Sequence, residues 1–301
     1  MKLLLEEAWY RQVKRWWSVS LAALVLSACS HRTDNAPCPT AEPRDPPACR
    51  TDAEPYPRVL VAGAEVGAPV FGRIASLIRW RDGYLHRQQD AKVYLRSKLQ
   101  PLDLVLVSSR GKATHRLLPG TFIHVAVYLG TEKELRTLGL WKDETVQAHA
   151  DAIKAGDIFI EAVSEGVRLA SADEVFNVDQ AIVLRPTVAS PKRKRALLRH
   201  FFSEIGTGFD FRFDAGDDER LFCAELANHV LANQDIPLRE VYGRTAIVPD
   251  DIVASALEGR SRLRFAAYVS ADREGWTAGN KADLKRDYFS TSAAANSGAC
   301  S

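Results

Sequence analysis

Short runs in which hydrophobic and polar residues alternate occupy the middle of the chain, and a period of two is typical of β-strands. In the clearest run, residues 122–129, aliphatic side chains would line one face of a sheet while His124 would share the other face with aromatic and small side chains. Runs of similar character cover residues 102–108, 157–163, 166–169 and 181–185. The pattern predicts a small, mostly antiparallel sheet in which the second and third of these four runs form a hairpin.

Hydrophobic residues spaced three and four apart predict helices before and after this sheet. Residues 69–99 have this spacing, and Gly83 interrupts it, so we expect a helical hairpin or a bent helix that packs on the main domain. The connection at residues 131–156 is polar and is expected to be partly helical. Residues 192–205 predict another helix, whose apolar stripe consists of Leu197, Leu198, Phe201 and Phe202.

A further helix contains Cys223. Its apolar stripe has the spacing of a single buried face and consists of Cys223, Leu226, Ala227, Val230 and Leu231. The cysteine is therefore expected to face protein rather than open water. The start of the helix stays open, because Asp217 or Asp218 is a good N-cap but a start near Phe222 is equally consistent with the pattern. Only the second start would give Cys223 the full effect of the helix dipole, which favours a thiolate.

The N-terminus has the composition of an export signal. Arg11, Lys14 and Arg15 precede an apolar run at residues 19–28, which is shorter than the roughly 20 residues that span a bilayer. Leu26-Ser27-Ala28-Cys29 resembles the bacterial lipobox, which implies cleavage before Cys29 and acylation of its thiol. We expect a lipoprotein of the bacterial cell envelope, and Ser30 fits sorting to the outer membrane, facing the periplasm. An ordinary signal peptide with a coincidental cysteine and an uncleaved anchor are the alternatives.

Composition divides the rest of the chain. Half of the 14 prolines fall between Pro37 and Pro57, which predicts a stiff, extended spacer. A Ser/Ala/Asn-rich stretch near the end predicts disorder, and the central part, about 200 residues, is enough for one well-cored domain. The expected segments are a lipoprotein signal peptide at 1–28, a Pro-rich linker at 29–57, a helical extension at 58–100, a catalytic domain at 101–270 and a disordered tail at 271–301.

The charge of the chain is nearly balanced, since 40 basic and 38 acidic residues give a net charge of +2. This argues against a nucleic-acid-binding protein, which would show a strongly basic face. The basic run at residues 192–195 follows Pro191 and fits the solvated first turn of a helix better than a phosphate or localisation patch. Neither a C-x-x-C nor an H-E-x-x-H spacing occurs, so we expect no metal site and no cofactor.

The five cysteines agree with export. Cys29 is assigned to lipid and Cys223 to chemistry. A disulfide between Cys38 and Cys49 would close a short loop in an oxidising compartment, and Cys300 would stay free or pair elsewhere. The sequence leaves this pairing open, and it leaves the oligomeric state open as well.

Cys223, His124 and Glu161 are the candidate reactive residues. A thiol, an imidazole and a carboxylate are the parts of a nucleophile–base–orienter relay. Each also has a structural explanation: the cysteine as a small core hydrophobe, the histidine as a satisfied core residue, and the glutamate as the partner of an arginine. The three together favour a cysteine hydrolase or acyltransferase.

The order of the motifs resembles a known family, the permuted papain-like hydrolases of the NlpC-type superfamily, specifically the YaeF/YiiX-like group. The resemblance covers about half of the chain, from Leu102 to Asp251. In ordinary papain-like enzymes the cysteine precedes the histidine, whereas here it comes last, which is the permuted order. Four blocks carry the resemblance: residues 119–130; Ile160-Glu161-Ala162 with Gly166-Val167; Gly208-Phe209-Asp210-Phe211 with Phe213; and Phe222-Cys223-Ala224-Glu225-Leu226 with Pro249-Asp250-Asp251.

The resemblance implies an α+β fold in which a small antiparallel sheet packs against helices. It also implies Cys223 as the nucleophile, His124 as the base and Glu161 as the orienting group, and it places Phe209, Asp210 and Phe222 at the substrate. The family usually has tyrosine before this aspartate and before the cysteine, and serine after the cysteine. This chain has Phe209, Phe222 and Ala224 instead, so hydroxyl contacts with substrate are lost while the relay is kept.

Three functions remain open for a membrane-tethered protein of this kind. The first is an amidase or peptidase that acts on cell-wall peptides through an acyl thioester. The second is a lipid or ester acyl hydrolase or acyltransferase, and the third is a non-catalytic lipoprotein with a decayed site, against which the intact relay argues. An open polar groove would favour a peptide substrate, whereas an apolar tunnel beside Phe209, Phe211 and Phe213 would favour acyl chains.

Overall fold

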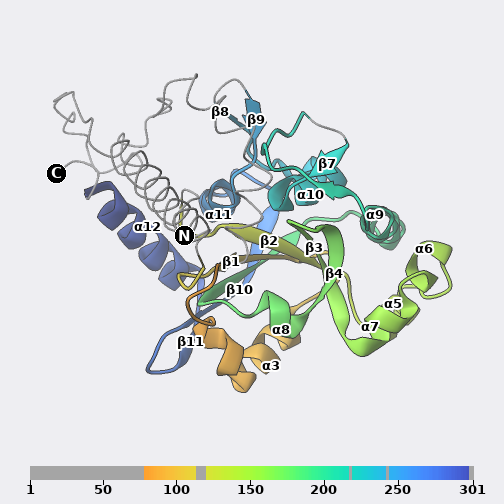
Figure 1. Cartoon of the computed structure of the whole chain (residues 1–301), viewed down its shortest axis with the longest axis horizontal. Helices are drawn as coiled ribbons and strands as arrows, with labels where there is room; N and C mark the ends of the chain where they lie inside the picture. The colour runs from red at the N-terminus through yellow and green to blue at the C-terminus, as the bar shows by residue number, and fades with distance from the viewer. Residues whose placement is uncertain (1–77, 113–119, 217–218, 242–243, 298–301) are drawn as a thin grey trace, which may run out of the picture. The chain divides into compact units, whose positions relative to one another are not determined.

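The structure, a computed structural model, describes residues 78–112, 120–216, 219–241 and 244–297, all of which belong to one compact unit of the chain (Figure 1). The expected signal peptide, the Pro-rich linker and four cysteines (Cys29, Cys38, Cys49 and Cys300) lie outside the described residues, as do most residues of the first expected helical segment. Among the helices within these ranges, none is both long enough and apolar enough to cross a membrane.

A seven-stranded sheet forms the centre of the unit, and every neighbouring pair of strands is antiparallel. Five of the strands follow the alternating runs of the sequence. The strands in spatial order are β11 (Trp276–Gly279), β10 (Leu263–Ala271), β5 (Gln180–Pro186), β1 (Leu104–Ser108), β2 (His124–Tyr128), β3 (Asp157–Val163) and β4 (Gly166–Ser171). The predicted antiparallel sheet is confirmed, and it is larger than expected because β10 and β11 extend one side.

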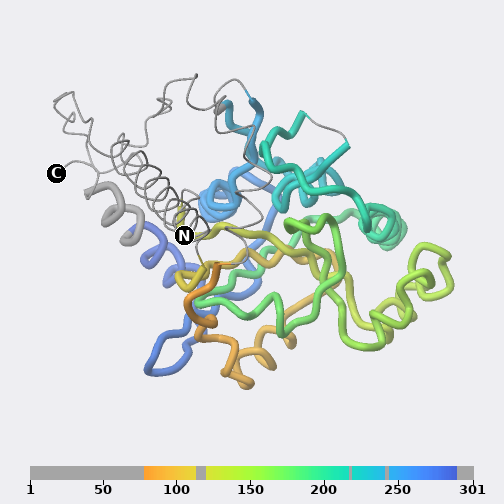
Figure 2. Tube along the Cα trace, in the orientation of Figure 1, coloured from red at the N-terminus to blue at the C-terminus, as the bar shows by residue number. Residues whose placement is uncertain are grey.

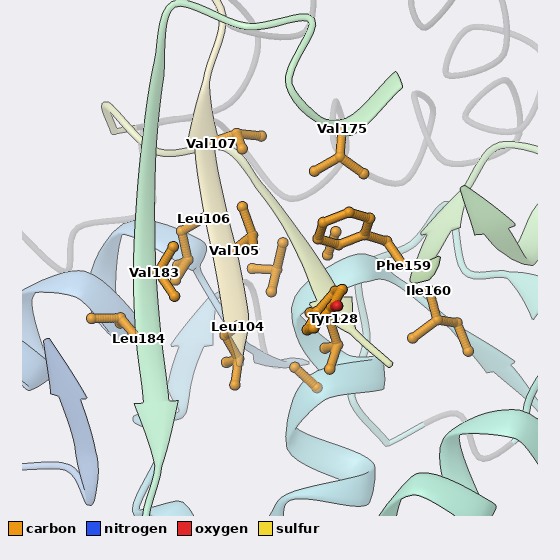
Figure 3. Close-up of a cluster of buried hydrophobic side chains, with 14 of the residues drawn as sticks. Leu104, Val105, Leu106, Val107, Tyr128, Phe159, Ile160, Val175, Val183 and Leu184 are labelled. Carbon is orange, nitrogen blue, oxygen red and sulfur yellow. The ribbon is translucent and has the colours of Figure 1, made fainter. Parts of the chain in front are cut away.

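Both faces of the sheet are covered. All five residues of β1 are buried, and the close-up in Figure 3 shows aliphatic side chains of β1 and β5 beside the aromatic rings of Tyr128 and Phe159. In Figure 1, α10 (Cys223–Val230) and α11 (Pro249–Glu258) lie on one side of the sheet, and α3 (Gln89–Lys98) and α8 (Ala172–Val175) lie on the other. The alternation in β2 therefore separates two buried faces rather than a buried face from an exposed one.

The expected helical segment before the sheet is confirmed for the part after Gly83. This part consists of η1 (Tyr84–Arg87) and α3, which pack against the C-terminal strands β10 and β11 (Figure 2). Residues 78–83 are not helical, and Arg79 forms a β-bridge with Lys112 instead. Leu85, Ala91 and Leu95 are fully buried at this contact. Together with a paired contact from Arg81 to Asp179 at 2.7 and 2.8 Å, this burial fixes the segment to the domain.

The polar connection between β2 and β3 is partly helical, as expected. It contains α5 (Glu132–Thr137), α6 (Glu144–Gln147) and α7 (Ala150–Ala155). Thr131 and Glu134 form a capping box at the start of α5, in which each side chain accepts the other residue's backbone N–H. The Asp143 side chain likewise caps α6, whereas α7 begins without a side-chain cap.

After β5 the chain forms the layer that carries the cysteine. α9 (Pro191–Ser203) leads to β6 (Gly208–Phe209), which pairs in parallel with β7 (Arg220–Leu221) immediately before α10. Beyond α10 come η2 (Ala232–Gln234), the hairpin of β8 (Arg239–Val241) and β9 (Arg244–Ala246), and α11.

The prediction of a disordered tail at 271–301 is wrong for residues 271–297. Residues 276–279 form β11, and α12 (Lys281–Ser297) follows, with Leu284 and Tyr288 almost fully buried. The Ser/Ala-rich composition of the segment led to the prediction of disorder. Leu284 and Tyr288 are nevertheless four positions apart and therefore lie on one face of the helix. The packed domain consequently extends beyond residue 270.

Candidate active site

His124 and Glu161 lie on adjacent central strands of the sheet. Ala126 of β2 pairs with Glu161 of β3, so His124, two residues before Ala126, is the diagonal neighbour of Glu161 on the same face. His124 Nε2 lies 2.8 Å from Glu161 Oε2. This bond leaves Nδ1 of the ring for a second partner and fixes the orientation of the imidazole.

The other oxygen of Glu161 is also occupied. Arg168 of β4 lies directly opposite Glu161 in the β3–β4 hairpin, and its Nη2 donates to Oε1 at 2.7 Å. The sequence left two alternatives open for this glutamate, pairing with an arginine or orienting His124. The structure shows both at once, with one carboxylate oxygen for each partner.

Cys223 is the first residue of α10, and Phe222 is its N-cap. The helix therefore begins at the second of the two starts that the sequence allowed. α10 packs against β2 and β3, which brings the thiol within hydrogen-bonding reach of the His124 ring. The Glu225 side chain accepts the backbone N–H of Phe222 at 3.2 Å and so holds the turn that leads into the helix.

The electrostatics of the site favour a protonated imidazole beside an ionised carboxylate. Burial by itself lowers the pKa of His124, but the charge and hydrogen bond of Cys223, followed by those of Glu161, raise the pKa to about 10. Burial likewise raises the pKa of Glu161, but His124, Arg168 and Lys112 more than offset this and hold that pKa below its usual value. His124 is therefore protonated at neutral pH, with the Glu161 carboxylate on one side of its ring and the sulfur of Cys223 on the other.

The turn that enters β2 is held by a residue to which the sequence analysis gave no role. Asp250, the second residue of α11, is 2% exposed, and its Oδ1 accepts the backbone N–H groups of Thr121 and Phe122, both at 3.0 Å. Gly120 has a φ of +103°, and a Cβ there would lie 2.7 Å from that of Asp250. The glycine and the aspartate of the family motif thus position the strand that carries His124.

Arg168 could have been predicted from the hairpin. Two residues separate Val163 at the end of β3 from Gly166 at the start of β4, and a two-residue turn fixes which residues face each other. Counting back from the turn places Arg168 opposite Glu161. Asp250 carried no such local signal, because its partners are more than a hundred residues away.

The three predicted substrate-contacting residues differ in their surroundings. Asp210 is fully buried, and its carboxylate accepts the backbone N–H groups of Arg212 at 2.8 Å and Asp214 at 2.6 Å, which shapes the loop before β7. Phe222 is 1% exposed and packs against Phe213. Both residues therefore contribute to the packing of the loop before α10, and their contact with substrate stays a prediction. Phe209 is half-buried, and its contact with substrate stays a prediction.

A family model described as "permuted papain-like amidase enzyme, YaeF/YiiX, C92 family" matches residues 98–270, which is more than half of the chain. The chain belongs to this family. No curated protein and no solved structure matches the chain significantly.

Membership of the permuted papain-like amidases confirms the resemblance and the fold expected from it, and it makes the protein a papain-like enzyme of the amidase class. The matched range contains Cys223, His124 and Glu161 and ends within β10. β11 and the buried residues of α12 lie beyond it.

Proposed function

We propose that this protein is an envelope amidase, held at a membrane by lipid on Cys29, that cleaves an amide bond of a cell-wall peptide. The observation that carries the proposal is the contact of Cys223 with His124 at the start of α10, with Glu161 on the far side of the ring. A thiolate held by an imidazolium at a helix N-terminus is the arrangement of an activated nucleophile.

Acylation follows from this arrangement. Cys223 Sγ attacks the amide carbonyl carbon and forms an S–C bond, while the carbonyl oxygen takes the negative charge. The backbone N–H of Cys223, at the first helical position, has no acceptor within its own helix and is available to this oxyanion. When the C–N bond breaks, the His124 imidazolium gives its proton to the leaving amine.

Hydrolysis of the thioester completes the cycle. A water molecule attacks the acyl carbon, and neutral His124 takes its proton. The C–S bond breaks, which releases the carboxylic acid and returns Cys223 as a thiolate beside protonated His124. Glu161 keeps the imidazole oriented and stabilises its charge throughout, and Arg168 in turn fixes Glu161.

A lipid or ester acyl hydrolase on the same relay is the second candidate, and a specific observation favours it. Phe209 packs edge-on against Phe211 and Phe213, with ring centroids 4.9 and 6.0 Å apart, and Phe213 is 37% exposed. Phe213 also contacts Phe222, the residue before the nucleophile. These partly exposed rings beside the cysteine could contact an acyl chain.

The two candidates are separated by incubating the wild type and Cys223→Ser with purified cell wall and with phospholipid vesicles. The proposal expects the wild type, but not the variant, to release amines from cell wall and nothing from vesicles. Fatty acid released from vesicles alone would select the second candidate. Absence of product from both substrates would contradict both, and His149→Ala, a change at the start of α7, serves as the matched active control.

A further inference from the structure

A group of three metal-ligating side chains lies outside the relay. His200 and Glu204 are four residues apart at the C-terminal end of α9 and just beyond it, and His229 is in the last turn of α10. Their ligand atoms all lie within 4.8 Å of one another. His200 Nε2 is 3.1 Å and His229 Nε2 is 3.6 Å from the same oxygen, Glu204 Oε1. We propose that these three residues bind a divalent transition-metal ion, with Zn²⁺ as the best fit.

The spacing of the ligands fits a tetrahedral ion. Bonds of about 2.0–2.1 Å at the tetrahedral angle place ligand atoms about 3.4 Å apart and two imidazole centroids about 5 Å apart. The two nitrogen-to-oxygen separations lie on either side of the first value, and the His200 and His229 ring centroids are 5.1 Å apart. Three protein ligands of this kind leave a fourth position for water.

The carboxylate is oriented by a neighbour. Thr207 Oγ1 donates to Glu204 Oε2 at 3.3 Å, which leaves Oε1 to face the two imidazoles. A hydrogen bond to the non-ligating atom is the usual way in which a protein fixes a metal ligand. The histidine side chains are 41% and 40% exposed, so an ion can reach the site from solvent.

The chemistry of the ligands selects the class of ion. Imidazole nitrogens favour Zn²⁺ and other late first-row metals, whereas Mg²⁺ and Ca²⁺ require oxygen ligands. The sequence predicted no metal site, because it contains neither a C-x-x-C nor an H-E-x-x-H spacing. His200 and Glu204 share one helix, but the third ligand comes from another, so no contiguous motif exists.

The position of the site gives it a consequence for the enzyme. α9 and α10 are in contact, and the ion would join their C-terminal ends (Figure 1). α10 begins with Cys223 and ends near His229, so the bound ion would hold the far end of the helix that presents the nucleophile. The role is therefore structural, and the relay itself includes none of the three ligands.

The test uses the full mature chain carrying Cys223→Ser, because the catalytic thiol with His124 could itself bind Zn²⁺. After chelation and dialysis, ZnCl₂ is added during calorimetry and thermal unfolding. We expect the protein to bind one Zn²⁺ ion. His229→Ala and Glu204→Gln should abolish this binding or lower its affinity at least tenfold, whereas His149→Ala should leave the affinity unchanged. In the parent, Tm should rise by about 5 °C or more at 100-fold excess over Kd, while MgCl₂ should leave Tm unchanged.

Equal Zn²⁺ affinity in the parent, His229→Ala and Glu204→Gln would overturn the proposal, as would absence of binding at micromolar Zn²⁺. Glu204→Gln preserves side-chain size and the Thr207 contact, so it stays informative if His229→Ala fails to fold. Because binding is measured without the nucleophile, the result does not depend on the proposed amidase activity.

Discussion

At the scale of single residues, the proposed roles make the reactivity of Cys223 depend on His124. An imidazolium beside a thiol stabilises the thiolate, and only a thiolate reacts readily with alkylating agents. We therefore expect His124→Ala to slow alkylation of Cys223 by iodoacetamide at neutral pH by at least about tenfold. Mass spectrometry of the peptide that contains Cys223 gives the rate, and His149→Ala is the matched control. Equal rates in the wild type and His124→Ala would remove the assignment of the base.

The pH dependence of activity follows from the same pair. His124 must carry a proton to protonate the leaving amine, and its pKa is raised to about 10 by Cys223 and Glu161 against the opposing effect of burial. Activity should therefore persist above neutral pH and fall as pH rises through about 10. Glu161→Gln removes one of the two negative partners, so its alkaline limb should move to lower pH.

The pH profile of kcat/KM, measured for each protein with an assay for released amine, gives the alkaline limb of the wild type and that of Glu161→Gln. A wild-type limb near the ordinary histidine value of about 6.5 would contradict the charged pair. An alkaline limb at the same pH in Glu161→Gln as in the wild type would contradict the role of the carboxylate.

The residues of the relay could be predicted from the sequence because each has a distinctive side chain within a periodic segment. What the sequence could not give was their environment. Asp210 and Phe222 belong to the family motif, and both are buried contacts within the protein. Burial depends on packing between distant segments, which a motif does not encode.

At the scale of elements, Asp250 joins α11 to the turn before β2. Asp250→Ala leaves two buried backbone N–H groups without this acceptor, each costing about 1–3 kcal/mol. We expect the free energy of unfolding to fall by about 3 kcal/mol or more, measured by urea denaturation. Asp272→Ala removes a similar acceptor of two N–H groups from an exposed turn and should cost much less. Equal losses in the two variants would contradict the importance of burial at Asp250.

The C-terminal helix should be part of the stable domain. Tyr288 Oη donates to Asp250 Oδ2 at 3.0 Å, so α12 supports the same turn from the other side. Truncation after Asn280 removes buried Leu284 and Tyr288 as well, and core truncations of this size cost about 2–5 kcal/mol each. Circular dichroism should show a lower Tm for the truncated protein. An unchanged Tm would mean that α12 does not pack as described.

Elements with a strong period were predicted with nearly correct bounds, as β3 and the β3–β4 hairpin show. β10 was missed although it is nine residues long. Its run, Leu263–Ala271, is rich in small residues and shows no clean alternation, because the register shifts between Phe265 and Ala267. Context from β5 and β11, rather than local pattern, makes it a strand.

At the scale of the whole molecule, the proposed lipid anchor would keep the folded enzyme near its substrate. Cys29→Ser removes the expected acylation site but not the export signal. We expect the variant to move from the membrane fraction to the soluble periplasmic fraction while its activity in detergent is unchanged. Immunoblots of fractionated cells check this. Retention of Cys29→Ser in the membrane fraction would favour the uncleaved anchor instead.

The two contacts of Glu161 limit how this site can be redesigned. A carboxylate can accept hydrogen bonds on both oxygens, whereas a glutamine has one acceptor oxygen and one donor group. A glutamine at 161 would therefore turn an NH₂ group towards either the imidazolium or the guanidinium. Replacing its cross-strand neighbour Arg168 with an acceptor such as glutamine in the same protein would remove that clash. The double substitution should accordingly be less harmful than the sum of the two single ones, so engineers would have to treat positions 161 and 168 as one unit.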